Sequence, residues 1–269
     1  MAPRNEPLET YFASCWELYW SVAEEHGEVC GHCPIAYFGD FAAFLDSSPR
    51  VLTVGLNPSH REFGDKKGER FPDTVHVDRS LSTDPTWLNS VYARDLDSYF
   101  YSGRNPYRGW FDPSFMAVLQ GLEVSFYPGD SQVYGQALHS DLYSPIATNP
   151  TWSRLPPVGA LRARLFDAGP QLWNLFVEIL QPDIIVASMQ RNGVQQLGLN
   201  IIGATTMLTS VTEKKGRTCA SVQPFSLKTG KQGLLMTGGA GRKPMNAFRP
   251  EDRVRIGKEV RLRWLQTTG

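Results

Sequence analysis

The sequence predicts an α/β protein with a mainly parallel sheet, folded as a single domain over residues 1–269. Short apolar runs that suit buried parallel strands alternate with segments of helical periodicity. No internal repeat and no linker composition divides the 269 residues, and the composition is ordinary for a globular protein.

The first half of the chain opens with apolar residues at helical spacing, which predict an amphipathic helix over 7–26. A second short helix is expected over 37–45, and the run Val-Leu-Thr-Val-Gly-Leu predicts a buried strand over 51–56. The region 59–110 is charged and rich in Gly, Pro and aromatic residues, which predicts a long ordered loop.

The later elements continue the alternation of helix and strand. Asp112, as a cap, and Pro113, at the first position, predict the start of a helix. The remaining elements are expected in this order: helix 113–122, strand 136–142, helices 161–166 and 170–180, strand 184–188, helix 191–198, a hairpin of 205–212 with 218–226, strand 234–237 and a basic helix over 250–266.

The charge balance limits the classes of function. The 27 basic and 27 acidic residues cancel, so no global field attracts nucleic acid, and local basic clusters matter more. No apolar run approaches the roughly 18 residues of a membrane span, and the N-terminus lacks a signal-peptide pattern. We therefore expect a cytoplasmic protein without a membrane partner.

The four cysteines include the pair in Cys30-Gly-His-Cys33, which matches the Cys-x-x-Cys motif of thioredoxin-type redox sites. That chemistry needs its first Cys at a helix start directly after a strand, whereas here the pair follows a helical segment and runs into Pro34. A zinc or iron–sulfur site would need further ligands. Reduced structural thiols are favoured, and neither a metal nor a cofactor is expected.

Polar side chains follow three of the predicted strands: Asn57, Asp141 and the loop 238–246. In open α/β sheets, ligands bind outside the carboxyl ends of the strands, so these residues are candidates for one site. The plainer alternatives are an Asn-Pro turn after the first strand and a cap or turn role for Asp141.

The order and spacing of these segments resemble the uracil-DNA glycosylase superfamily over roughly residues 50 to 265. Gly55-Leu-Asn-Pro-Ser59 is similar to its first motif, Gly-x-(Asn/Asp)-Pro-x, at the end of the first strand. The resemblance implies a three-layer αβα sandwich with a four-stranded central sheet. It also implies a monomer that binds double-stranded or single-stranded DNA and uses no cofactor.

The resemblance implies roles for individual residues. Asn57 would position the attacking water, and Asp141 would read the edge of the base. Phe71, or Phe63 in its place, would stack on the extruded base, although a core role for Phe71 is equally expected. The other implied assignments are Gly55, Leu56 and Ser59 to substrate binding, and His60 to DNA binding.

The last motif of the superfamily is similar to Gly241-Arg-Lys-Pro-Met-Asn246. Pro244 and Met245 resemble a pair that wedges into the minor groove, but the usual His of this motif falls on Gly241. Arg242 or Lys243 would supply the missing positive charge, or bind phosphate as part of a basic loop. The remaining DNA contacts are assigned to Asn246 and Arg249, and to the basic last helix, whose charges alternatively form a solvated face: Arg253, Arg255, Lys258, Arg261, Arg263.

The residue types suggest which base is removed after it is taken out of the stack. An ionised Asp141 only accepts hydrogen bonds, which suits the N4 amine of cytosine and opposes the O4 of uracil. Ser59 is small, so a 5-substituent fits. Together with the resemblance, which implies a glycosylase that leaves an abasic site, we therefore expect a 5-modified cytosine as the base. Because the superfamily includes phage-defence glycosylases, the resemblance further implies a modified base of phage DNA, such as glucosylated hydroxymethylcytosine.

Several alternatives stay open. Asn57 does not titrate, so it orients water without acting as a base, and Lys66, Lys67 or Lys243 leaves room for a Schiff-base route with strand cleavage. The chain is alternatively a uracil or mismatch glycosylase of DNA repair. It is otherwise a catalytically weak nucleic-acid binding module, or an unrelated α/β enzyme acting on a nucleotide.

Overall fold

The computed structural model of the chain describes residues 6–64, 70–130, 133–208, 219–239 and 243–268. The chain divides into two compact units that interleave along the sequence. Unit 1 comprises Met1–Ala42, Leu56–Pro106 and Ser140–Ile179, and unit 2 comprises Ala43–Gly55, Tyr107–His139 and Leu180–Gly269. The single domain expected over 1–269 stays a prediction, and each unit is described here by itself.

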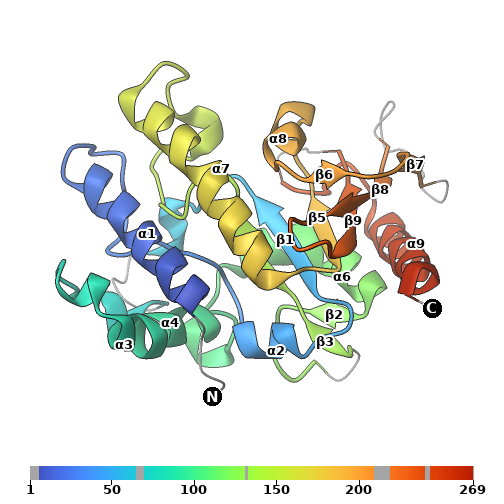
Figure 1. Ribbon diagram of the computed structural model, residues 1–269, viewed down its shortest axis with the longest axis horizontal. Helices are drawn as coiled ribbons and strands as arrows, with labels where there is room; N and C mark the ends of the chain where they lie inside the picture. The colour runs from blue at the N-terminus through green and yellow to red at the C-terminus, as the bar shows by residue number, and fades with distance from the viewer. Residues whose placement is uncertain (1–5, 65–69, 131–132, 209–218, 240–242, 269) are drawn as a thin grey trace. The chain divides into compact units, whose positions relative to one another are not determined.

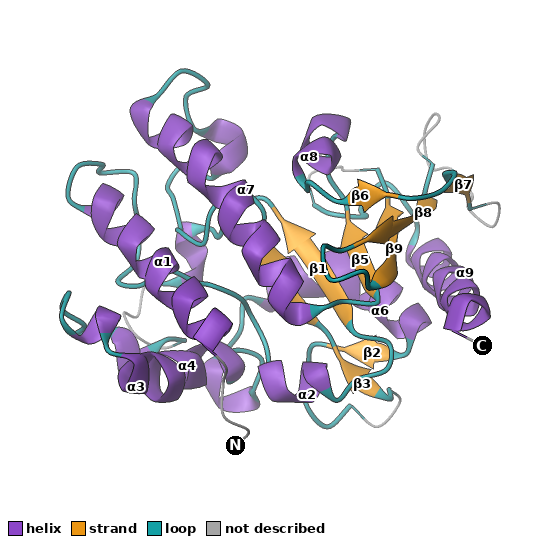
Figure 2. Ribbon diagram, viewed as in Figure 1, coloured by secondary structure: helices purple, strands orange, loops and turns teal. Residues whose placement is uncertain are grey.

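The main sheet has the strand order β4-β1-β5-β9-β8-β6, with β7 paired to β8. Figure 2 draws the strands in orange, with β1, β5, β6, β7, β8 and β9 labelled. Both β1–β5 and β5–β9 are parallel, while β8 pairs antiparallel with β6, β7 and β9. The strands are β1 (Val51–Gly55), β4 (Leu138–Asp141), β5 (Ile184–Ala187), β6 (Asn200–Ile201), β7 (Thr206–Met207), β8 (Ser221–Ser226) and β9 (Gln232–Thr237).

The expected α/β class with a mainly parallel central sheet is confirmed, but the expected number of four strands is wrong. The sheet has seven strands among the described residues, because an antiparallel β8 and two short partners extend it beyond β9. The antiparallel pairing of β7 with β8 confirms the two arms of the expected hairpin, whose turn residues 209–218 lie outside the described part. A separate parallel pair, β2 (Val124–Ser125) with β3 (Gly135–Gln136), was not predicted.

The central strands are buried along their whole length, which is why their sequences read as continuous apolar runs. All five residues of β1 and all four of β5 are buried. The register aligns Val51 with Ile184 and Ile184 with Leu234, so β1, β5 and β9 run side by side. Thr53, a polar residue within β1, is satisfied by the Leu138 carbonyl at 3.2 Å and the His139 ring at 2.8 Å.

Unit 2 also holds two helices in very close contact, α6 (Ala117–Leu122) and α9 (Pro250–Thr268), which lie side by side (Figure 1). Glycine makes this possible, because a Cβ at Gly121 would lie 2.9 Å from the Gly257 Cα. The other helical elements of the unit are α5 (Arg108–Phe111), η6 (Asp112–Met116) and α8 (Arg191–Gln196).

The expected helix start at Asp112 is wrong. The helix begins at Arg108 and runs through a π-helical turn at 112–116 into α6, so Asp112 has helical backbone angles. Its carboxylate accepts a short hydrogen bond from the Tyr127 hydroxyl instead of capping the helix. A cap preference in the sequence is therefore overridden by a partner 15 residues away.

Unit 1 contains α1 (Glu6–Ala23), which is close to the expected 7–26, and the residues expected to form a long loop. That expectation is wrong in detail, because the described residues of 59–106 form a series of short helical turns around buried aromatic residues. The turns are η1 (His60–Glu62), η2 (Pro72–Thr74), η3 (Leu81–Thr83), α3 (Pro85–Trp87), η4 (Leu88–Tyr92), α4 (Ala93–Asp97) and η5 (Ser102–Arg104); α2 (Phe41–Leu45) and η7 (Trp152–Arg154) are similarly short.

The two helices expected over 161–166 and 170–180 are one helix, α7 (Ala160–Leu180), with Pro170 inside it. A proline inside a helix removes one hydrogen bond and costs about 3 kcal/mol. The helix continues because Trp173, Phe176 and Val177 are buried beyond it, and burying such side chains contributes about 1.5–3 kcal/mol each. No described helix has the length and apolar composition needed to cross a membrane.

Candidate functional site

The chain segments that follow β1 and β4 are joined in unit 1. The Tyr143 amide donates a hydrogen bond to the Leu56 carbonyl at 2.8 Å, and the Thr148 amide donates to the Pro58 carbonyl at 3.3 Å. Asn57 lies between Leu56 and Pro58, and Asp141 ends β4 two residues before Tyr143. The chain segments that carry the polar residues at these two strand ends are therefore adjacent.

The Asn57 side chain spans two stretches of the loop after β4. Its Oδ1 accepts from the Trp152 amide at 2.9 Å. Its Nδ2 donates to the Thr148 hydroxyl at 2.8 Å and to the Ile146 carbonyl at 3.4 Å. An amide has two donors and two acceptor lone pairs, so one lone pair on Oδ1 stays available. Asn57 is thus a rigid group that also holds the loop in place.

Sequence analysis missed Glu62, a buried carboxyl in η1 that follows the Asn57 motif. Its Oε2 accepts a short hydrogen bond from the Tyr99 hydroxyl, and the Arg70 Nη1 lies 3.8 Å away. Burial raises the pKa of Glu62 from its ordinary 4.5 to about 7; the Tyr99 hydrogen bond and Arg70 oppose this rise, and the charge of Asp141 adds to it. Glu62 is therefore a group that gains or loses its proton near neutrality.

Arg70 fixes the η1 turn that carries Glu62. Its Nη1 donates to the Glu62 carbonyl at 2.9 Å and also to the Arg61 carbonyl, and its Nε donates to the Asn105 carbonyl at 2.7 Å. The start of the turn is capped by Ser59, whose hydroxyl accepts from the Arg61 amide at 3.2 Å. Ser59 consequently has a local structural role besides the predicted one of leaving space for a 5-substituent.

Phe71, the expected stacking residue, is buried between two other rings. Its centroid lies 5.7 Å from that of Tyr99 in a stacked pair and 5.6 Å from that of Phe63 in a tilted one. These contacts favour the alternative that Phe71 is a core residue. Phe63, the reserve candidate, packs edge-on against His32 and lies over Gly31, so its ring is engaged as well.

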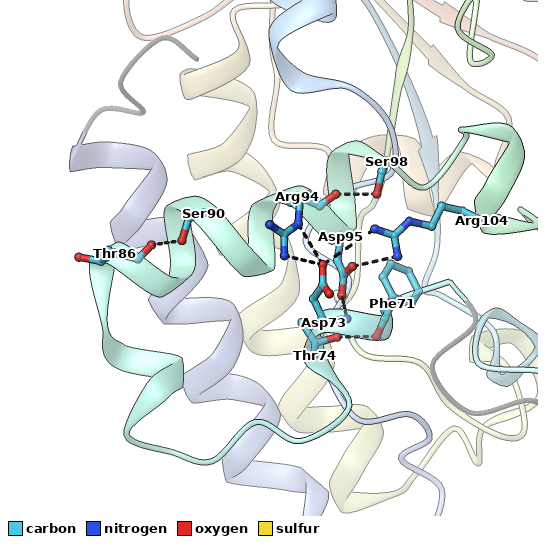
Figure 3. Close-up of polar contacts among 9 residues, drawn as sticks. All are labelled: Phe71, Asp73, Thr74, Thr86, Ser90, Arg94, Asp95, Ser98 and Arg104. Atoms are coloured by element: carbon cyan, nitrogen blue, oxygen red, sulfur yellow. Dashed lines mark hydrogen bonds and ion pairs between the residues drawn. The ribbon is translucent and has the colours of Figure 1, made fainter.

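Two arginines and two aspartates form a network of ion pairs at η2, the turn that follows Phe71 (Figure 3). Arg94 donates to Asp73 at 2.8 Å, Arg104 lies 4.0 Å from Asp73, and Arg104 lies 3.3 Å from the buried Asp95. Asp95 also accepts from the Asp73 amide at 2.9 Å. Burial, and then the charge of Asp73, raises the pKa of Asp95 to about 6, while Arg104 acts in the opposite direction. The η2 turn that follows Phe71 is therefore tied to α4 and η5 by ion pairs.

The last motif lies in unit 2, and Arg242 is outside the described residues. Lys243 donates through Nζ to the Gly109 carbonyl at 2.6 Å. Met245 is fully buried against Gly238, so in this conformation its side chain is not available to a DNA groove. Pro244 is half-buried, and Asn246 is exposed.

Ser188, at the end of β5, anchors this last loop and was missed by sequence analysis. Its hydroxyl accepts from the Met245 amide at 2.7 Å and donates to the Gly239 carbonyl at 3.3 Å. Met245 has a positive φ of 57°, an uncommon backbone conformation for a residue with a side chain. The serine therefore satisfies a buried amide in a constrained turn.

The basic residues of α9 are largely paired with acidic residues or carbonyls. Arg253 is buried and donates to the Pro113 carbonyl, while Arg261 pairs with Glu123 at 2.8 Å and Arg263 with Glu259 at 3.0 Å. Arg255 pairs closely with Asp252. These contacts favour the interpretation of α9 as a packed helix with a solvated charged face. Lys258 and Arg249 are exposed.

The remaining predicted residues lie at the end of β1, at the start of η1, or outside the described residues. Gly55 is buried at the end of β1, and His60 begins η1. Lys66 and Lys67, considered for a Schiff-base route, lie outside the described residues. A cavity of about 370 Å³ in unit 2 is lined by residues within 112–133 and involves none of the predicted site residues.

The four cysteines are free thiols, and burial raises the pKa of Cys33 well above its usual range. Burial also raises the pKa of Cys30. A thiol that resists ionisation is a poor nucleophile, so the Cys30–Cys33 pair lacks the character of a redox site. Within the described ranges, no group of three or more His, Cys, Asp or Glu residues is arranged to hold a metal ion.

Comparisons of the chain with protein-family models, with curated proteins and with solved structures found no match.

Proposed function

We propose that this protein is a DNA glycosylase that hydrolyses the N-glycosidic bond of an everted 5-modified cytosine and leaves an abasic site. The proposal includes membership of the uracil-DNA glycosylase superfamily, for which the motif Gly55–Ser59 is the main support. One observation carries it: the hydrogen bond of 2.8 Å between the Tyr143 amide and the Leu56 carbonyl, which makes the segments of Asn57 and Asp141 neighbours.

The order of the strands supports a ligand site at this place. β1 lies between β4, the next strand of this sheet along the chain, and β5, the one after it. The chain leaves β1 toward β4 on one side and leaves β5 toward β6 on the other, which creates a topological switch point between the carboxyl ends of β1 and β5. Ligands of open α/β sheets bind at such points.

Asn57 is suited to hold a water molecule against the sugar. Its three hydrogen bonds fix the amide, and the second lone pair on Oδ1 accepts one hydrogen of the water. A positioned water lowers the entropic part of the barrier. Because an amide does not titrate, Asn57 only orients the water. The water oxygen bonds to C1′ of the cationic sugar as the bond to the base breaks, and the proton it loses passes to the departing base or to solvent.

Asp141 is suited to distinguish cytosine from uracil. An ionised carboxylate accepts from the cytosine N4 amine, whereas the O4 of uracil would leave two acceptors opposed. An unpaired buried polar group costs about 1–3 kcal/mol, which corresponds to a discrimination of about tenfold to more than a hundredfold. Glu62 lies near enough for the charge of Asp141 to act on it, so both carboxyls belong to the same proposed site.

A second candidate is a DNA-binding module without catalytic activity. The observation that favours it is the use of Asn57 as a clamp between Thr148 and Trp152, together with the burial of Phe71 and Met245. Such a protein would bind DNA with strong salt dependence and release no base.

The test is to incubate the protein with genomic DNAs that carry different cytosine modifications, and to measure free bases by mass spectrometry and abasic sites chemically. We expect release of a 5-modified cytosine, and a loss of about a hundredfold or more in the Asn57→Ala variant. Thr148→Val is the matched control, because it removes the partner of Asn57 Nδ2 but keeps the Asn57 amide.

Retained activity in Thr148→Val, with loss in Asn57→Ala, supports a direct role for Asn57. Equal losses in both variants would reduce Asn57 to a loop clamp. Salt-sensitive binding without release of any base would reject the glycosylase in favour of the binding module.

A further inference from the structure

We infer that the loop at Leu155–Gly159 inserts its tip, Val158, into the base stack of duplex DNA. The inference rests on the proposed function, because it assigns the residue that opens the duplex beside the candidate site. Met245, which the sequence suggests for this task, is buried. The argument uses the exposure, the stiffness and the charge of the segment Thr151–Phe166.

The tip of the loop is an apolar side chain surrounded by solvent. Val158 is 98 % exposed and follows Pro156 and Pro157, which are also exposed. Prolines fix their backbone φ angles, so little conformational entropy is lost when such a tip is held in one position. Proteins that kink DNA insert apolar wedges of this kind between base steps from the minor groove.

The base of the loop is rigid. Leu155 is 2 % exposed and anchors the loop in unit 1. Arg162, in the first turns of α7, donates to the carbonyls of Leu155 at 2.8 Å and Trp152 at 3.2 Å. Its guanidinium also lies over the Trp152 ring, 4.7 Å from the centroid. A side chain can separate stacked bases only if the loop that carries it keeps its shape. The contacts of Leu155, Trp152 and Arg162 hold this loop in one conformation.

The charge of the segment matches a phosphate backbone. Residues 151–166 contain three arginines and no acidic residue, although the whole chain has zero net charge. Arg154 is exposed, and Arg164 pairs with Glu25 at 3.4 Å in a contact open to solvent. Phe166, 41 % exposed, adds an aromatic face to the same segment. Arg162 and Arg164 have partners in the protein, so the exposed Arg154 beside the apolar tip is the arginine best placed for a phosphate contact.

The loop is connected directly to the candidate site. The Trp152 amide donates to Asn57 Oδ1 at 2.9 Å, and the Trp152 ring stacks on Tyr143 at a centroid distance of 4.3 Å. Tyr143 is the residue whose amide joins the segments of Asn57 and Asp141. Insertion of Val158 would therefore take place beside the position into which the base turns.

The test compares the wild-type protein with Val158→Gly, and uses Tyr134→Ala as the control at another exposed apolar residue, in unit 2. Excision is measured on duplex and on single-stranded DNA of the same sequence. We expect Val158→Gly to lower excision from the duplex about tenfold or more and to leave single-stranded excision unchanged, because a single strand has no stack to open. Tyr134→Ala should change neither.

Two binding measurements keep the inference separate from the proposed function. Fluorescence of 2-aminopurine in a duplex should rise on binding of the wild-type protein and stay low with Val158→Gly, whether or not any base is released. Arg154→Ala should lower the slope of log affinity against log salt by about 0.9. Equal duplex excision, or an equal fluorescence rise, in wild type and Val158→Gly overturns the insertion. Failure of excision on all DNA with a preserved fluorescence difference overturns the glycosylase alone.

Discussion

The buried carboxyl of Glu62 makes the stability of the protein depend on pH near neutrality. Glu62 keeps its proton in the folded state up to about pH 7, whereas in the unfolded chain it ionises around its ordinary value of 4.5. Below 4.5 both states hold the proton. Between pH 4.5 and about 7, Glu62 ionises in the unfolded chain but not in the folded protein. Ionisation lowers the free energy of the unfolded state, so the free energy of unfolding falls as the pH rises through this range.

The magnitude follows from the two pKa values. The difference is 7 − 4.5 = 2.5. At about 1.4 kcal/mol for each pKa unit, the folded protein loses up to about 3 kcal/mol of stability between mildly acidic and mildly alkaline solution. Glu62→Gln removes the titration and keeps an oxygen that accepts from the Tyr99 hydroxyl. The variant should therefore lack this loss.

The assay is urea unfolding of both proteins at several pH values between about 4 and about 8. We expect the free energy of unfolding of Glu62→Gln relative to wild type to rise by about 3 kcal/mol across this range. Asp95→Asn is the control for a second buried carboxyl, with a pKa raised to about 6, and its effect should end at lower pH. Parallel stability curves for wild type and Glu62→Gln would refute the argument from burial.

Three further predictions concern other parts of the molecule. Asp141→Asn should shift excision toward uracil by about tenfold or more, and an unchanged ratio of uracil to cytosine release would remove Asp141 as the reader. Gly169→Ala should lower the free energy of unfolding by about 1–3 kcal/mol, because the new Cβ would lie 1.8 Å from a backbone oxygen, whereas Gly159→Ala meets nothing nearer than 3.5 Å and serves as control in thermal unfolding. Ser188→Ala leaves the Met245 amide without its acceptor and should cost about 1–3 kcal/mol in urea unfolding; a loss within error would contradict this account.

The central strands could be predicted because their burial on both faces leaves a continuous apolar run in the sequence. β1, β5 and β9 were all found in this way, and so was the position of Asn57 after β1. The antiparallel pairing of β7 with β8 was predicted as a hairpin. β6 was not predicted, since it is two residues long and exposed, and it pairs through backbone groups that any residue carries.

The region 59–110 could not be predicted in detail because distant contacts stabilise its short helical turns. Glu62 sits in a charged stretch that reads as solvent-exposed, and only the folded chain brings Tyr99 and Arg70 to it. The burial of Phe71 has the same origin, since it needs the stacked ring of Tyr99. Local composition contains no sign of either partner.

The hydrogen bonds of Asn57 limit which substitutions at this position the 146–152 loop would tolerate. An aspartate at this position would add a true base, but it would replace the donor that faces the Ile146 carbonyl at 3.4 Å with a second acceptor. The resulting repulsion would push the 146–152 loop outward and disturb the support of Val158. A variant with a faster proposed reaction would therefore also need compensating changes in that loop, because the same contacts support the proposed base and the proposed wedge.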